Sequence, residues 1–146
     1  MQKPSPLAIS DALVFALSRE NNRLTLLDEA SHLLRRFGQL DVLDLSADSE
    51  TEFELRAEAD RFIFPISGSL RARLIDLRKG SPSEGTRTEI ELDAQNLSGL
   101  LSPFGVALSL RAETEARVIV LSTHGRAHSE DRILAADELT KFSAVQ

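Results

Sequence analysis

Apolar and polar residues alternate over several short segments of this chain. Leu70, Ala72 and Leu74 alternate with arginines, and the same period of two recurs at 53–57, 88–92 and 106–111. Two further runs, at 62–66 and 118–121, are apolar throughout. Successive side chains of a β-strand point to opposite faces, so the first pattern indicates half-buried strands and the second fully buried ones. The chain is therefore predicted to be mainly β.

Turn residues separate these segments. Residues 13–17 and 24–27 are predicted to form a hairpin with its turn at Asn21 and Asn22, because asparagine tolerates left-handed backbone. Residues 61–77 are predicted to form a second hairpin around Gly68. Residues 28–36 fit either a helical turn or a strand end, and 78–87 are predicted to be a loop. About ten short strands, spaced roughly ten residues apart, predict a sandwich or barrel.

The two ends of the chain are predicted to differ from this pattern. Residues 1–12 are expected to be an N-terminal tail, and 13–146 a single domain. A short helix is expected to start at Ser129, with Glu130 and Asp131 in its first turn, where acidic side chains favour the helix dipole. The residues expected to form its apolar stripe are Ile133, Leu134, Leu139 and Phe142.

Composition narrows the possible functions. The net charge of −6 argues against nucleic-acid binding, which needs clustered positive charge. No apolar run is long enough for a membrane span, and Asp11 interrupts what would be a signal-peptide core, so a cytoplasmic protein is expected. The 146 residues contain no Cys, which removes disulfides and thiolate sites, and no Tyr or Trp.

Several stretches carry a resemblance to a known family: 22–29, 64–70 with its Ser-Gly-Ser turn, 99–105, 120–122, 128–133 and 137–139. Their order and spacing resemble the cupins of the dTDP-sugar 3,4-ketoisomerase and dTDP-4-dehydrorhamnose 3,5-epimerase type. The resemblance implies a double-stranded β-helix, or jelly roll, with a short C-terminal helix. It also implies a homodimer and a nucleotide-sugar ligand.

The chain departs from this family at the positions that carry its chemistry. The family's histidine pair falls on Glu54 and Arg56, an acidic or amide position falls on Arg61, and the second-motif histidine falls on Leu108. These residues are not a set that holds a divalent ion, so neither a metal nor a cofactor is expected. Glu54 is the candidate general base. The candidate ligand-binding residues, whose guanidinium groups suit phosphate or carboxylate oxygens, are Arg56, Arg61 and Arg111.

Two orientations of this segment stay open. If the resemblance gives the register, Glu54 and Arg56 face the barrel interior. Alternation alone instead places Phe53, Leu55 and Ala57 in the core and Glu54 in solvent, because a shift of one residue exchanges the two faces. The second orientation fills the barrel and leaves no pocket.

Other polar residues give weaker signals. His124 and His128 are four residues apart, but Gly125 favours a loop over a metal-binding helix face. His32 is expected to be structural or exposed. The acidic run lacks the spacing of a calcium loop and is expected to be solvated; its members are Asp44, Asp48, Glu50 and Glu52.

Two functions follow as hypotheses. The first is a degenerate, metal-independent relative of dTDP-sugar isomerases and epimerases that binds a nucleotide sugar or another small anionic ligand. The second is a catalytically silent cupin that acts as a structural or protein-interaction module. An open barrel mouth containing Glu54 and the arginines favours the first, and a barrel filled by Phe53, Leu55 and Leu108 favours the second.

Overall fold

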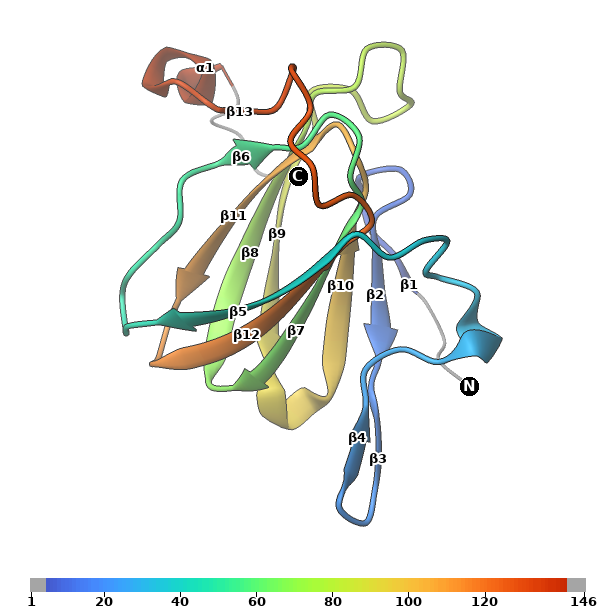
Figure 1. Cartoon of the computed structure of the whole chain (residues 1–146). Helices are drawn as coiled ribbons and strands as arrows, with labels where there is room; N and C mark the ends of the chain where they lie inside the picture. The colour runs from blue at the N-terminus through green and yellow to red at the C-terminus, as the bar shows by residue number, and fades with distance from the viewer. Residues whose placement is uncertain (1–4, 142–146) are drawn as a thin grey trace.

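The computed structural model describes residues 5–141, which form two antiparallel β-sheets facing each other across one core (Figure 1). The strand order of the six-stranded sheet is β1 (Ser5–Pro6), β2 (Leu13–Ala16), β10 (Ser98–Ser102), β7 (Arg61–Ser67), β12 (Ala116–Ser122) and β5 (Gln39–Leu45). The order of the five-stranded sheet is β13 (Arg132–Ile133), β6 (Glu54–Leu55), β11 (Val106–Ala112), β8 (Ser69–Asp76) and β9 (Arg87–Asp93). The all-β architecture is the one that the alternation predicts.

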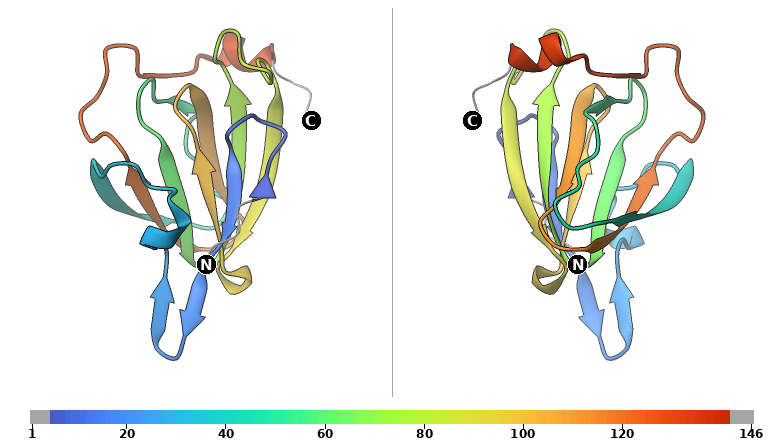
Figure 2. Two further views of the ribbon diagram at one scale, coloured as in Figure 1. Left: turned by 90° about the vertical axis from the view of Figure 1, so that its right-hand side faces the viewer. Right: turned by 90° about the vertical axis from the view of Figure 1, so that its left-hand side faces the viewer.

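The remaining elements lie outside these two sheets. Strands β3 (Ser18–Glu20) and β4 (Arg23–Thr25) form a separate hairpin that projects beyond one end of the barrel (Figure 2). Its turn contains Asn21 at φ 53°, as the sequence predicts. The predicted pairing of 13–17 with 24–27 is wrong, because Leu13–Ala16 pairs with β1 and β10 instead. Two 3-10 turns, η1 (Glu29–Ser31) and η2 (Ala94–Asn96), and one helix, α1 (Ala136–Thr140), complete the fold. No helix in residues 5–141 has the length and apolar composition needed to cross a membrane.

The hairpin predicted around Gly68 is wrong in its pairing. Strand β7 pairs with β10 and β12, whereas β8 pairs with β9 and β11, so the chain changes sheets at Gly68. Gly68 has φ 78°, and a Cβ at this position would lie 2.2 Å from the carbonyl oxygen of Glu115. Only glycine fits this corner. The alternation and the turn residue identify both strands, but they do not identify the partner of either.

Both sheets are covered on their outer faces as well as on the inner ones. Inside the barrel the core contains Ile63, Leu74 and Leu108. Outside the six-stranded sheet, Phe15, Phe62 and Phe64 pack beneath leucines from the segment between β3 and β5; these are Leu24, Leu26, Leu27 and Leu33. Outside the five-stranded sheet, a third cluster is covered by the C-terminal segment and contains Phe53, Ile75, Ala107 and Leu134. The fold therefore has three apolar layers.

The predictions for the chain ends need two corrections. Residues 5–12, expected to be tail, belong to the barrel: β1 pairs with β2, and Ile9 and Ala12 are fully buried. The C-terminal helix starts at Ala136 rather than after Ser129, because Asp131 accepts hydrogen bonds from the backbone N–H groups of Ala57 (2.7 Å) and His128 (2.9 Å). Phe142 lies outside the described residues.

The loop at 78–86 is held by a buried carboxylate. Asp76 ends β8 and is fully buried, and it accepts hydrogen bonds from the Arg78 Nε (2.9 Å), the Ser81 hydroxyl (2.7 Å) and the Ser83 hydroxyl (2.6 Å). Arg78 in turn donates to Asp11 at 3.1 Å. Burial alone would raise the pKa of Asp76, but these hydrogen bonds outweigh it and lower the pKa to about 2.

We expect Asp76→Asn to destabilise the protein most above pH 4. The ionised form of Asp76 is favoured in the folded state, so its contribution is complete above the unfolded pKa and is lost as the pH falls toward 2. The difference in unfolding free energy between wild type and variant should therefore shrink by about 2 kcal/mol between pH 4 and pH 2. Urea titrations at several pH values measure this difference. A difference that does not change with pH would contradict the ionised network.

Candidate functional site

A cavity of about 330 Å³ lies inside the barrel, between the two sheets. It is lined by residues from β5, β6, β7, β11, β12 and β13 and from the segment before β6. We call its charged end, formed by Glu54 and Arg61 with Ile133 nearby, the mouth. Strands β6 and β13, which contribute Glu54 and Ile133, lie toward the upper end of the barrel in Figure 1. The lining residues are Leu43, Thr51, Glu52, Glu54, Arg61, Ile63, Leu108, Leu110, Val120 and Ile133.

The orientation of β6 decides between the two registers left open by the sequence. Glu54 lines the cavity, as does Leu108, its β-sheet partner on β11. Phe53 and Leu55 on either side of Glu54 belong instead to the outer cluster beneath Leu134. Phe53 and Leu55 are shielded because the C-terminal segment covers this outer face of the sheet. The expectation of a barrel filled by Phe53 and Leu55 is therefore wrong, although both residues are buried.

Arg61 is the most buried charged group at the mouth. It is 4% exposed, and its Nη2 donates to the carbonyl oxygens of Glu54 (3.0 Å) and Val106 (2.9 Å). Its Nη1 lies 3.4 Å from Glu54 Oε1, and the Glu54 side chain is 50% exposed. Burial lowers the pKa of Arg61 to about 10; Glu54 opposes this shift, and Arg56 adds to it. Arg61 thus remains a cation at neutral pH.

Two buried polar atoms beside this ion pair lack a hydrogen-bond partner in the described part of the chain. They are Arg61 Nε and Ser102 Oγ. Arg61 on β7 is paired in register with Ser102 on β10, so both side chains leave the same face of the sheet. Buried polar groups in native proteins are almost always satisfied by protein, water or ligand. Both atoms therefore retain unused hydrogen-bonding capacity in this corner of the barrel.

Arg56 does not line the cavity. Its Nε donates to Asp131 Oδ2 at 3.0 Å and its Nη2 to the carbonyl oxygen of His124 at 2.9 Å. The pKa of Asp131 is lowered: burial acts to raise it, but hydrogen bonds from the backbone of Ala57 and His128, together with Arg56, prevail. Arg56 therefore connects the segment after β6 to the segment between β12 and β13.

Arg111 also lies away from the cavity. It is exposed on β11, next to Leu110, which faces the barrel interior, and its Nη2 is 3.9 Å from Asp48. The ligand-binding roles expected for Arg56 and Arg111 remain predictions, and neither side chain contributes to the cavity.

The structure brings two further polar residues to the cavity that the sequence analysis did not select for it. Thr51 and Glu52 precede β6 and line the cavity together with Glu54. The sequence contains a signal that could have identified Glu52. It is two residues before Glu54, and in an extended chain its side chain would point to the same face.

The remaining candidates do not form a metal centre. His124 and His128 lie in a loop after β12, as expected, and His124 Nε2 is 3.4 Å from Glu58. His32 is exposed at the end of η1. Within residues 5–141 no group of three or more His, Cys, Asp or Glu side chains is close enough to hold a metal ion.

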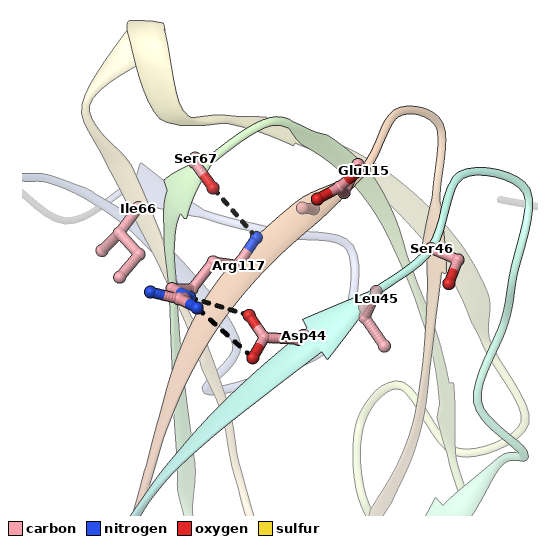
Figure 3. A pocket seen from close by; sticks show the side chains of 8 residues that line it. Asp44, Leu45, Ser46, Ile66, Ser67, Glu115 and Arg117 are labelled. Atoms are coloured by element: carbon pink, nitrogen blue, oxygen red, sulfur yellow. Dashed lines mark hydrogen bonds and ion pairs between the residues drawn. The ribbon is translucent and has the colours of Figure 1, made fainter.

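A wider hollow of about 700 Å³ lies at one end of the six-stranded sheet, where β5 and β7 end and β12 begins (Figure 3). Its charged groups already bind each other, because Arg117 Nε donates to Asp44 Oδ1 at 2.7 Å. Both side chains are more than half exposed. We therefore assign the candidate site to the barrel cavity, which contains a buried charge.

Comparisons of sequence identify no relatives: no protein-family model matches the chain, and no curated protein matches it. Comparison of structures does identify similar proteins. The Mycobacterium tuberculosis rmlC epimerase superposes with a TM-score of 0.85 at 18% identity, over 98% of this chain and 78% of that one. A dTDP sugar isomerase from Desulfovibrio desulfuricans also gives 0.85 at 18% identity, over 96% and 93%. ChmJ, a 3'-monoepimerase from Streptomyces bikiniensis in complex with dTDP-quinovose, gives 0.79 at 15%, over 93% and 75%.

These likenesses show the fold. The chain is a cupin-type jelly roll of the kind found in dTDP-4-dehydrorhamnose 3,5-epimerases and related sugar isomerases, as the resemblance in the sequence implied.

We expect Arg56→Ala to loosen the segment at 124–134 without unfolding the barrel, because its ion pair with Asp131 anchors that segment at the edge of the mouth. Hydrogen–deuterium exchange should increase there and remain unchanged in β7 and β12. Arg111→Ala, which removes an exposed arginine, is the matched control. Equal exchange in wild type and Arg56→Ala would show that the ion pair does not hold the segment.

Proposed function

We propose that this cupin-fold chain binds a small anionic ligand, with a nucleotide sugar as the first candidate, in the barrel cavity and on Arg61, without a metal ion. The observation that carries the proposal is the buried guanidinium of Arg61, which lines an open cavity. A buried charge is costly unless it is fully paired, and the bond from Arg61 to the half-exposed Glu54 is long. A ligand oxygen would complete the pairing.

The nucleotide sugar is the first candidate because of the structural neighbours. One, from Bacillus anthracis, is described with TDP and PPi bound, and another with dTDP-quinovose bound. Their low sequence identity restricts this argument to an analogy of fold.

A purely structural module is the alternative, and the cavity argues against it. A barrel that serves only as a scaffold gains stability from close packing, and an unfilled interior loses those contacts. Here the barrel retains about 330 Å³ bordered by a charged pair.

The general-base role of Glu54 belongs to the same proposal. A ligand carbonyl bound by Arg61 would place its neighbouring carbon close to the Glu54 carboxylate, which could then accept a proton. On this view Glu54→Gln retains ligand binding and loses turnover. The cytoplasmic location expected from the sequence remains a prediction.

We also propose that the chain forms a homodimer through the outer side of β5. This strand is at the edge of the six-stranded sheet, and Leu40 and Val42 on its outer side are 55% and 57% exposed. An exposed apolar row on an unpaired sheet edge favours association, and a second copy of the same edge gives a closed two-fold interface.

We expect dTDP or a dTDP-hexose at millimolar concentration to raise the melting temperature of the wild-type protein, since a ligand that binds only the folded state stabilises it. The shift should be absent in Arg61→Met and unchanged in Arg19→Ala, which removes an exposed arginine of the β3–β4 hairpin. Differential scanning fluorimetry over a concentration series gives the result. An equal shift in wild type and Arg61→Met would place any binding elsewhere.

We expect Val42→Lys to convert the dimer into a monomer. In the dimer, the charged lysine would be buried without a partner at the centre of the proposed interface, which is costly. In the isolated chain this position is exposed and tolerates a lysine. Light scattering after size-exclusion chromatography measures the mass, and circular dichroism verifies the fold. A monomeric wild-type protein would contradict this part of the proposal.

A further inference from the structure

The cavity walls are aliphatic apart from the charged end. No aromatic side chain of the described residues lines it. The phenylalanines that pack in clusters lie outside the barrel: Phe15, Phe62 and Phe64 are on one outer face and Phe53 is on the other. Nucleobases and sugar rings are commonly bound against aromatic faces. The aliphatic wall residues are Leu43, Ile63, Leu108, Leu110, Val120 and Ile133.

The size of the cavity limits what its interior can hold. A volume of about 330 Å³ is near the lower end of the range for small-molecule sites. The interior therefore suits a ligand at the small end of that range.

The buried cation at the mouth can bind a carboxylate head group. Arg61 is almost completely buried, and its Nε has no hydrogen-bond partner among the described residues. Glu54 Oε1 is 3.4 Å from Arg61 Nη1, which is long for an ion pair. The Glu54 side chain is half exposed and can turn toward solvent. A ligand carboxylate could therefore replace Glu54 at the guanidinium, and planar carboxylates suit the Arg fork.

We propose that the ligand of the barrel cavity is a short aliphatic carboxylate, whose head group binds Arg61 in place of Glu54 and whose chain lies among the leucine, isoleucine and valine side chains. This inference rests on the proposed function, which it deepens by naming the ligand class. It differs from the nucleotide-sugar candidate in both size and charge distribution.

Isothermal titration with straight-chain carboxylates from butanoate to dodecanoate, below their micelle concentrations, tests the ligand class. Each added methylene that enters the cavity should strengthen binding about fourfold. The gain should stop at the chain length that fills the cavity, so that binding strength passes through an optimum within this series. Hexanol and hexylamine should bind at least tenfold more weakly than hexanoate. Binding of hexylamine but not hexanoate would overturn the proposal and assign the cavity to Glu52 and Glu54.

Three variants locate the binding. Val120→Phe fills the cavity and should abolish hexanoate binding while leaving Arg61 in place. Glu54→Gln removes the competing carboxylate and should strengthen hexanoate binding about threefold. Arg19→Ala, on the β3–β4 hairpin away from the cavity, should change nothing. Circular dichroism verifies that each variant is folded, and weaker binding to Glu54→Gln would contradict the exchange of carboxylates.

The outcomes separate this inference from the function on which it rests. Binding of a dTDP-hexose through Arg61 without binding of any carboxylate would overturn the aliphatic ligand and leave the proposed function intact. Absence of binding for both classes would overturn the two together. Carboxylate binding with no chain-length optimum, unaffected by Val120→Phe, would indicate attachment to the protein surface and would also overturn the inference.

Discussion

A buried guanidinium is the constraint on which the mouth of this barrel depends. Arg61 begins β7 in one sheet and donates to the carbonyl oxygens of Glu54 and Val106, which belong to β6 and β11 in the other. It thus joins the two sheets at the point where the cavity opens. Because burying a cation is costly, this group favours an anionic partner beside it, and the Glu54 carboxylate lies 3.4 Å away.

The sequence predicts the strands of this fold better than their arrangement. Alternation identifies β8, β9 and β11, and Asn21 and Gly68 mark real turns. Pairing is not encoded locally, because Gly68 connects two sheets rather than two partners. Alternation also cannot say which face is the barrel interior when both faces are covered. Both neighbours of Glu54 are buried, and neither points into the cavity.

The site could be located in part. The family resemblance identified Glu54 and Arg61, because it placed the Glu54 side chain in the barrel interior. The hydrophobic alternation alone placed that side chain in solvent. Arg56 follows the same alternation as Glu54, but β6 ends at Leu55, and Arg56 turns to Asp131 instead. Ser102 could not have been found, because its proximity to Arg61 depends on the pairing of β10 with β7. Such contacts are visible only once the topology is known.

The topology also has a consequence for how the protein is made. Strand β5 pairs with β12 and β2 pairs with β10, so both sides of the six-stranded sheet join its centre only after late segments of the chain have been synthesised. Folds dominated by such non-local pairings fold slowly. The cavity walls extend from Leu43 to Ile133, so the site does not exist in any partly synthesised chain. A ligand could therefore stabilise only the finished protein, which would couple the survival of newly made copies to ligand supply.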